Sequence, residues 1–355
     1  MHALEASLAL YAALGNEPAT AQELSLPSFI IGSPPAQLLA HCAAEAFCWG
    51  LLALAQMHGG QVQHSLHSGR KALALSKESK NDWLQVMNTL YLAYALQDTG
   101  AYEEALVLMQ QTLELARTLP AIALQGFLTA LGSIYHALQQ WEEAQAALEE
   151  AEAVAETLGL GPFRMPGLSQ LCMHHALAGQ WEQAQRYALQ VIIIRKSHDA
   201  ALITLDFYHQ YETEALLHAG DERQAREEVQ RLGERLGPNR RFRLPYLRSL
   251  ATLAACNGQS EQAISHLREA AQIAGELGLP AECWQIQSAL GREYEAAGKH
   301  MQARTAFGEA AAIIQGLAEG IKNEALRSRF LAGPQIRPVL QHAQSLANEL
   351  LKNRV

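Results

Sequence analysis

Three histidines have the residue type and a spacing that could form a metal site. His64 and His67 are three residues apart, so a helix would place both on one face, and His58 lies nearby. Such a trio could hold a zinc ion that activates water in a metal-dependent hydrolase. No carboxylate or cysteine lies at a fitting offset to complete the ligand set. We therefore interpret these histidines as solvated or packed, and we expect no bound metal.

Paired acids offer a second kind of chemistry, because two neighbouring carboxylates can share general acid and base work. Glu103-Glu104 and Glu142-Glu143 open predicted helices. Negative charge is favourable at the N-terminus of a helix, where the backbone N–H groups are unpaired. A role in stabilising these helix starts is therefore a simpler interpretation than catalysis.

Six arginines form the main basic concentration of the chain. They are Arg231, Arg235, Arg240, Arg241, Arg243 and Arg248. Guanidinium groups bind carboxylates and phosphates in two-pronged geometry, so this segment could receive an acidic peptide or a phosphate. The alternative is a solvated loop between structural units that balances the nearby acids Glu227, Glu228 and Glu234. Because these acids are so close, we favour the second interpretation.

The sequence lacks the motifs of the common enzyme and cofactor sites. There is no G-x4-G-K-[ST] loop, no G-x-G-x-x-G after a strand and no G-x-S-x-G. The net charge of −9 argues against direct nucleic-acid binding, which needs clustered cations. The five cysteines show no C-x-x-C spacing, which is typical of reduced thiols in the cytoplasm. We predict a cytoplasmic protein that is not an enzyme, has no cofactor and does not bind membranes.

The elements that position these residues are helices, and the clearest example runs from Leu131 to Ala151. Apolar residues recur at three- and four-residue spacing on both sides of Gln139, so each of two helices has one face to bury. Gly132 and Ala144 are small where the two helices would cross. A single hairpin of this kind cannot bury its apolar face, whereas stacked copies can.

The hairpin recurs along the chain with a period of about 40 residues. The turn positions are Gly60, Gly100, Gln139, Gly179, Gly220, Gly258 and Gly298. Five residues after each turn is a small residue: Ser65, Ala105, Ala144, Ala184, Ala225, Ala263 and Ala303. A leucine lies eight residues before the turn in all copies but one, which has Glu212 instead. We expect that copy to be shifted in register or degenerate.

This pattern resembles the tetratricopeptide repeat, which carries W-x2-L-G-x2-Y followed by small and aromatic residues at fixed offsets. The period exceeds the roughly 34 residues of the common unit, as in the long-repeat MalT-like region of bacterial signalling ATPases and transcription activators. The segment AEGIKNEALRSRFLAGPQIRPVL is also similar to the tail of such regions. The resemblance implies an all-α, right-handed α-solenoid of tandem helix-turn-helix repeats.

We divide the chain into three parts. Residues 1–43 are a partial N-terminal repeat with a proline-rich loop, residues 44–317 are seven repeats, and residues 318–355 are C-terminal capping helices. The apparent start within a repeat indicates either a piece of a longer polypeptide, which we favour, or an unpaired capping helix. Gly161-Pro162, Pro166-Gly167, Gly237-Pro238 and Pro280 are predicted breaks between repeats.

In a stack of such hairpins the first helices line the concave face. The residues expected to bind a partner there are Tyr91, Tyr94, His136, Gln170, Phe207, Tyr211, Arg248 and Arg292. Tyrosine and arginine are among the side chains that anchor partners most often. We therefore predict a scaffold that binds a protein or peptide. The alternative is the sensor region of a larger bacterial ATPase or transcription activator, with a small effector as its ligand.

Overall fold

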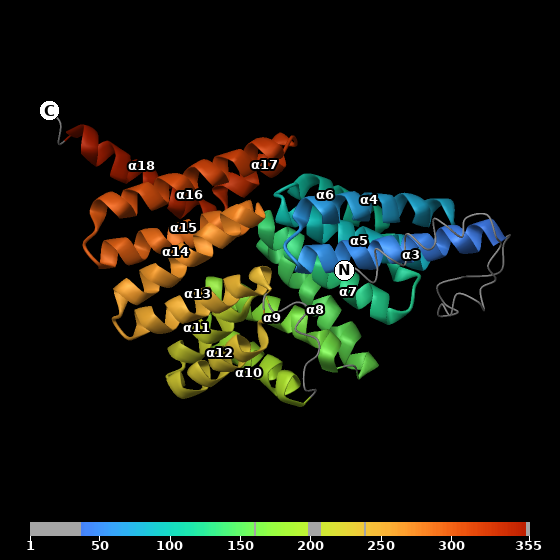
Figure 1. Cartoon of the computed structure of the whole chain (residues 1–355), viewed down its shortest axis with the longest axis horizontal. Coiled ribbons are helices and arrows are strands. Elements are labelled where there is room, and N and C mark those ends of the chain that lie inside the picture. Colours follow the sequence, from blue (N-terminus) through green and yellow to red (C-terminus); the bar gives the residue numbers. More distant parts are fainter. Residues whose placement is uncertain (1–36, 160, 198–206, 238, 353–355) are drawn as a thin grey trace.

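The computed structural model describes residues 37–352, apart from 160, 198–206 and 238. The predictions for residues 1–36 concern residues outside this range. Every regular element in the described range is a helix, and the labels follow Figure 1, starting at α3.

The helices form seven consecutive pairs, each a helical hairpin. The first helices of the pairs are α3 (Gln37–His58), α5 (Asp82–Asp98), α7 (Ala121–Ala137), α9 (Gly161–Leu177), α11 (His209–His218), α13 (Arg240–Cys256) and α15 (Pro280–Ala296). The second helices are α4 (Val62–Glu78), α6 (Tyr102–Arg117), α8 (Trp141–Leu158), α10 (Trp181–Ser197), α12 (Glu222–Arg235), α14 (Ser260–Leu277) and α16 (His300–Gly320). Two further helices, α17 (Glu324–Ala332) and α18 (Ile336–Lys352), end the chain.

The turns inside the seven hairpins fall where the sequence pattern predicts them. All seven turn positions have a positive φ, including Gln139 at 61°, the one turn residue that is not glycine. The small residues five positions later are all fully buried, with 0% of their surface exposed. The two helices of a pair cross closely, because a Cβ on Gly132 would lie 2.7 Å from Cγ of Leu148. The structure is thus an all-α solenoid of helical hairpins.

One sequence prediction needs correction, and one that left two alternatives is resolved. Pro166 does not mark a break, because α9 begins at Gly161 and Pro166 lies within it. A proline inside a helix removes one N–H donor, yet α9 continues past Pro166 to Leu177. Of the two alternatives for the repeat with Glu212, the structure shows the degenerate one: its turn at Gly220 is in register, and Glu212 replaces the leucine with 1% of the residue exposed. Its carboxylate accepts a hydrogen bond from Oγ of Ser169 at 2.8 Å and pairs with Nη2 of Arg195 at 3.0 Å. A buried ion pair thus replaces the leucine.

The last helices pack against the turns of the first hairpins, so the solenoid closes on itself. Leu317 of α16 covers the turn between α5 and α6, where a Cβ on Gly100 would lie 2.2 Å from its Cδ2. The backbone N–H of Gln335 donates to Oε1 of Gln139 at 3.1 Å. Figure 1 shows α17 beside α6, on the side where these contacts form.

One hydrophobic cluster seals this junction. It contains residues of α5, α6 and α7 from the first half of the chain and of α15 to α18 from the end. The rings of Tyr102 and Phe330 lie 6.1 Å apart within it, and Phe330 is 1% exposed. Because the cluster draws on both ends of the solenoid, apolar burial stabilises the closed arrangement as well as the individual hairpins.

Candidate functional site

A cavity of about 520 Å³ lies where the first helices of the hairpins converge. Its wall is built mainly from α5, α7, α9, α11, α13 and α15, and the start of α18 adds Pro338 and Val339. The C-terminal helices therefore contribute to the wall in addition to ending the stack. Cavities of roughly 300–1,000 Å³ are typical of sites for small ligands.

The structure brings together most of the residues that the sequence placed on the concave face. The members that line the cavity are Tyr94, His136, Gln170, Phe207, Tyr211, Arg248 and Arg292. Tyr91 is not among the described residues that line it. Its ring instead packs against the hydrophobic cluster of the junction, and burial raises its pKa to about 12. Tyr91 and Tyr94 are three residues apart and lie on neighbouring parts of the α5 surface, but only Tyr94 lines the cavity.

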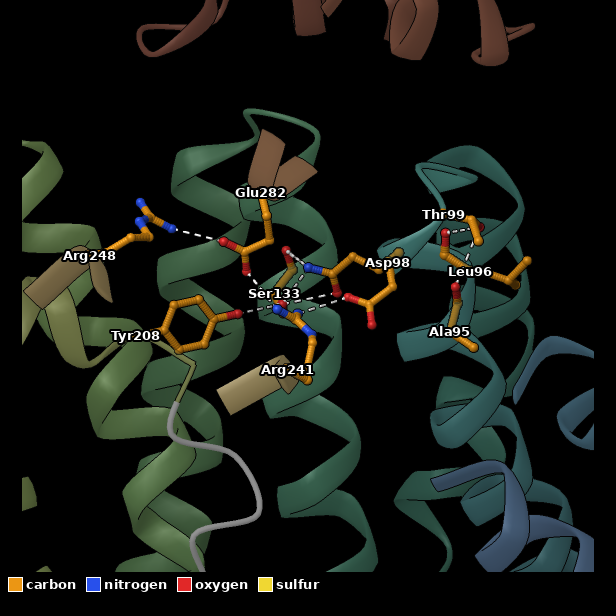
Figure 2. A network of polar contacts seen from close by, with 10 residues as sticks. Ala95, Leu96, Asp98, Thr99, Ser133, Tyr208, Arg241, Arg248 and Glu282 are labelled. Carbon is orange, nitrogen blue, oxygen red and sulfur yellow. Dashed lines mark hydrogen bonds and ion pairs between the residues drawn. The ribbon is translucent and has the colours of Figure 1, made fainter. Parts of the chain in front are cut away.

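An ion-pair network crosses the cavity wall and joins helices from distant repeats (Figure 2). Arg241 on α13 bridges two acids: its Nη2 lies 3.2 Å from Oδ1 of Asp98 on α5, and its Nη1 lies 3.1 Å from Oε1 of Glu282 on α15. Arg248 lies about two turns further along the same face of α13 and donates to the other oxygen of Glu282 at 2.9 Å. Only 4% of the Arg241 side chain is exposed, so these charges interact with little screening by water.

Burial and charge act on the two acids of the network with different results. Burial raises the pKa of Asp98, although Arg241 opposes this shift. Burial also acts to raise the pKa of Glu282, but Arg241 and Arg248 together hold it below its ordinary value. Two guanidinium groups stabilise the carboxylate of Glu282, whereas Asp98 has one. Oδ2 of Asp98 accepts no hydrogen bond from the described residues.

Neutral side chains extend the network toward α7. Nε2 of Gln97 donates to Oγ of Ser133 at 2.8 Å, and the hydroxyl of Tyr208 lies 3.1 Å from the same oxygen. Ser133 thus links α5 to the residue that precedes α11, as Figure 2 shows. At the end of α5, Oγ1 of Thr99 donates to the carbonyl of Leu96 at 2.9 Å, which stabilises the helix end that carries Asp98.

Aromatic rings hold Arg241 in place from the other side. The guanidinium carbon lies 4.4 Å from the ring centroid of Phe207, close enough for a cation–π interaction. Phe207 stacks in turn on Phe242 at a centroid distance of 5.2 Å, and His58 stacks on Phe242 at 5.9 Å. Phe207, predicted as a partner-binding residue, therefore also supports the buried arginine.

One wall residue, His136, forms a buried pair with His174. Nε2 of His136 lies 2.9 Å from Nδ1 of His174, and the ring of Trp141 contacts both at centroid distances of 5.3 and 5.1 Å. Burial lowers the pKa of His136 to about 3, and the neighbouring His174 adds to the shift. Burial likewise lowers the pKa of His174 to about 4. Both rings are therefore neutral at pH 7.

Sequence reasoning missed the acids of the network and misplaced one of its arginines. Arg240 and Arg243 are exposed and pair with Glu276 and Glu269, as expected for a surface segment. Arg241, between them, points into the interior and pairs with Asp98 and Glu282. Its position on the inner face of α13, shared with Arg248 seven residues later, is the sequence signal that could have separated it from its neighbours.

The sequence also raised the questions of a metal site and of membrane-spanning helices. Within the described ranges, no three His, Cys, Asp or Glu side chains are grouped so that they could hold a metal ion. His58 takes part in the aromatic stack instead. None of the helices in the part of the chain that the structure describes is both long and apolar enough to cross a bilayer.

Comparison with protein-family models and with curated proteins gives no match. Solved structures do match. The Rap protein complexed with Competence and Sporulation Factor is 14% identical, with a TM-score of 0.53, and the match covers 86% of this chain and 87% of that one. A chain of the APC/C hetero-tetramer Cut9-Hcn1 is 13% identical, with a TM-score of 0.52, over 96% of this chain and 59% of that one.

A tetratricopeptide repeat protein from Parabacteroides merdae also matches, at 11% identity and a TM-score of 0.43, over 80% of this chain and 97% of that one. Identities this low are informative about the fold alone. The two matches with TM-scores above 0.5 agree with the seven helical hairpins, whose turn residues all have positive φ. The chain has the fold of the tetratricopeptide-repeat proteins.

Proposed function

We propose that this protein is a non-catalytic binding protein that takes a short peptide in the cavity enclosed by its solenoid. The observation that carries the proposal is the composition of the cavity wall. Aromatic rings, amides and charged groups converge there from six first helices of the solenoid. A wall of this kind offers both apolar contact and hydrogen bonds, which together give affinity and orientation.

The size and closure of the cavity bear on the kind of partner. About 520 Å³ suits a ligand of a few residues, whereas a folded protein would need a much larger open surface. The junction between α17, α18 and the first hairpins closes the groove that an open solenoid would present. The Rap protein of the same fold was crystallised with Competence and Sporulation Factor, so this architecture can hold a ligand. These points favour a short segment over an extended protein partner.

A second candidate is effector sensing within a larger bacterial signalling ATPase or transcription activator. The same cavity volume favours it, because drug-sized molecules occupy sites of this size. Both candidates place the ligand at the same wall and differ in its chemistry.

Filling the cavity tests the proposal. Thr252 lines the cavity, and its Oγ1 donates to the carbonyl of Arg248 at 3.1 Å. Thr305 on α16 makes the same bond to Met301 at 3.1 Å and is exposed, so it provides a matched control. The full chain and the variants Thr252→Trp and Thr305→Trp are incubated with a degenerate mixture of short peptides that includes free and blocked termini. Retained peptides are identified by mass spectrometry after gel filtration.

We expect the wild type and Thr305→Trp to retain the same peptides. Thr252→Trp should retain at least about tenfold less, because the indole occupies the space of the ligand. Equal retention by Thr252→Trp, with an unchanged melting temperature, would place binding outside the cavity. Retention of no peptide by the wild type would contradict the peptide proposal itself.

A further inference from the structure

Two charged side chains of the cavity wall have no ion-pair partner among the described residues. Arg292 on α15 donates from Nη1 to Oγ of Ser288 at 3.1 Å and contacts no carboxylate. Glu214 on α11 accepts no hydrogen bond from the described part of the chain. Arg241 and Arg248 differ, because each forms an ion pair with Glu282 and Arg241 also pairs with Asp98. Arg292 and Glu214 therefore retain hydrogen-bonding capacity toward the cavity.

The pKa values of Glu214 and Arg292 are both shifted toward the neutral form. Burial raises the pKa of Glu214, although His218, Arg292 and Arg248 oppose the shift. Burial lowers the pKa of Arg292, although Glu214 opposes this. Each shift disfavours the charged form, as expected when nearby opposite charge only partly offsets desolvation. Arg292 is nevertheless exposed and Glu214 is half-buried, so a ligand can reach both. A ligand group of opposite charge would relieve both costs.

Two further acceptor oxygens of residues in the same wall also lack donors. Oε1 of Gln170 has no hydrogen-bond partner in the described structure, although Gln170 is only 2% exposed and its Nε2 donates to the carbonyl of Thr129. Oδ2 of Asp98 is a second such acceptor. A buried polar atom without a partner is unfavourable by roughly 1–3 kcal/mol, so native structures usually satisfy it. The wall thus offers acceptors for N–H groups and one guanidinium for an anion.

We propose that the cavity binds a zwitterion, namely the ammonium and carboxylate groups of an amino acid or a very short peptide. Glu214 accepts hydrogen bonds from the ammonium group, and Arg292 donates to the carboxylate. This assignment rests on the proposed function and specifies the ligand chemistry of that same cavity. Arginine suits the carboxylate because its parallel N–H groups match the two oxygens.

The wall also restricts the length of the ligand. Glu214 and Arg292 lie close enough for each charge to affect the pKa of the other group. The cavity that holds both ends has a volume of about 520 Å³, which limits how long the ligand between them can be. An extended chain separates its ends by up to about 3.3–3.6 Å per residue. A single amino acid or a peptide of two or three residues fits this requirement better than a longer segment.

The test compares ligands with free and blocked ends. The full chain is incubated with a degenerate tripeptide mixture in four forms: unblocked, N-acetylated, C-amidated and blocked at both ends. A mixture of the free amino acids forms a separate arm, which distinguishes the two sources of a zwitterion. The variants are Glu214→Gln and Arg292→Gln. Glu309→Gln and Arg268→Gln change exposed residues outside the cavity wall and serve as controls.

We expect the wild type and both controls to retain unblocked ligands and to lose about tenfold or more in retention when either end is blocked, as the loss of one charged hydrogen bond implies. N-acetylation should have no further effect in Glu214→Gln, nor C-amidation in Arg292→Gln. Each variant should thus be insensitive to the block at the end that its residue binds. This pattern requires direct contact and would not arise from a general loss of folding.

The outcomes separate this inference from the proposed function. If the wild type retains doubly blocked and unblocked tripeptides equally, the zwitterion assignment is wrong but peptide binding in the cavity stands. Retention of longer peptides alone, abolished by Thr252→Trp, would lead to the same conclusion. If no peptide or amino acid of any form is retained, the proposed function fails together with the inference.

Discussion

The guanidinium of Arg241 on α13 and the carboxylate of Asp98 on α5 form an ion pair at 3.2 Å across 143 residues of sequence. Glu282 on α15 is the second partner of the same guanidinium. One arginine thus joins α5 of the second hairpin to α13 and α15 of the last two hairpins, as Figure 2 shows. The pair lies in the cavity wall, so it connects the closed architecture to the site.

Replacing Arg241 by methionine should destabilise the protein strongly. Arg241→Met leaves Asp98 and Glu282 inside the protein without that cation, and breaking a buried pair in this way typically costs about 3–5 kcal/mol. Arg240→Met is the matched control, because Arg240 pairs with Glu276 at the surface and should contribute at most about 1 kcal/mol. Urea unfolding measures both. Similar losses in the two variants would show that the interior pair does not hold the solenoid closed.

Glycine-to-alanine changes at two turns should distinguish backbone strain in the turn from the packing of α16 against it. Gly100 has φ +81° and Gly179 has φ +73°, so alanine should be strained by about 1–2 kcal/mol at either turn. A Cβ at residue 179 would meet nothing within 4 Å, whereas one at residue 100 would clash with Leu317. We expect Gly100→Ala to lose about 1–3 kcal/mol more than Gly179→Ala. Adding Leu317→Ala should relieve that clash. Equal unfolding free energies for the two single variants would argue against the packing of α16 on this turn.

Glu103 should control the start of α17. Its carboxylate accepts hydrogen bonds from the backbone N–H groups of Lys322 and Asn323, the latter at 3.2 Å. Glu103→Ala removes this support, which is comparable to losing a helix cap worth about 1 kcal/mol. Hydrogen exchange at the amides of α17 should become faster. Glu104→Ala, which removes only an exposed pair with Arg70, should leave that exchange unchanged. Unchanged protection of α17 in Glu103→Ala would contradict the prediction.

The buried histidine pair predicts a loss of stability in mild acid. The folded-state pKa values of His136 and His174 are about 3 and about 4, below the ordinary value of 6.5. Between pH 6.5 and pH 4 the unfolded chain therefore binds protons that the folded chain does not. The free energy of unfolding should fall in this window by up to about 1.4 kcal/mol per pH unit for each histidine. His136→Gln should reduce the slope, and exposed His300→Gln should not. Identical slopes would contradict the assignment.

Two tyrosines of α5 should differ in their effect on binding. Both pack against the hydrophobic cluster of the junction, but of the two only Tyr94 also lines the cavity. Tyr94→Phe and Tyr91→Phe each remove only a hydroxyl, so neither should unfold the protein. Retention of the short-peptide mixture should fall in Tyr94→Phe and remain at the wild-type level in Tyr91→Phe. If Tyr91→Phe weakened retention more, the ligand would lie outside the cavity described above.

The sequence by itself determined the unit of the fold. A turn that tolerates positive φ and a small residue five positions later recur seven times, and all seven pairs occupy those roles in the structure. These are local requirements, because the chain reverses and the two helices touch within a single hairpin. The same periodicity placed Tyr94, His136 and Arg248 on the inner face of their helices, where they line the cavity.

The tertiary structure alone decided which repeats face one another. Periodicity shows the face of a helix that a residue occupies, but small rotations between hairpins add up along the solenoid. Their sum determines whether the stack stays open or closes, and no local pattern contains it. The pairing of Arg241 with Asp98 and the packing of Leu317 on Gly100 both depend on that sum. An arginine that belonged to a surface cluster in the sequence is therefore a buried charge in the folded protein.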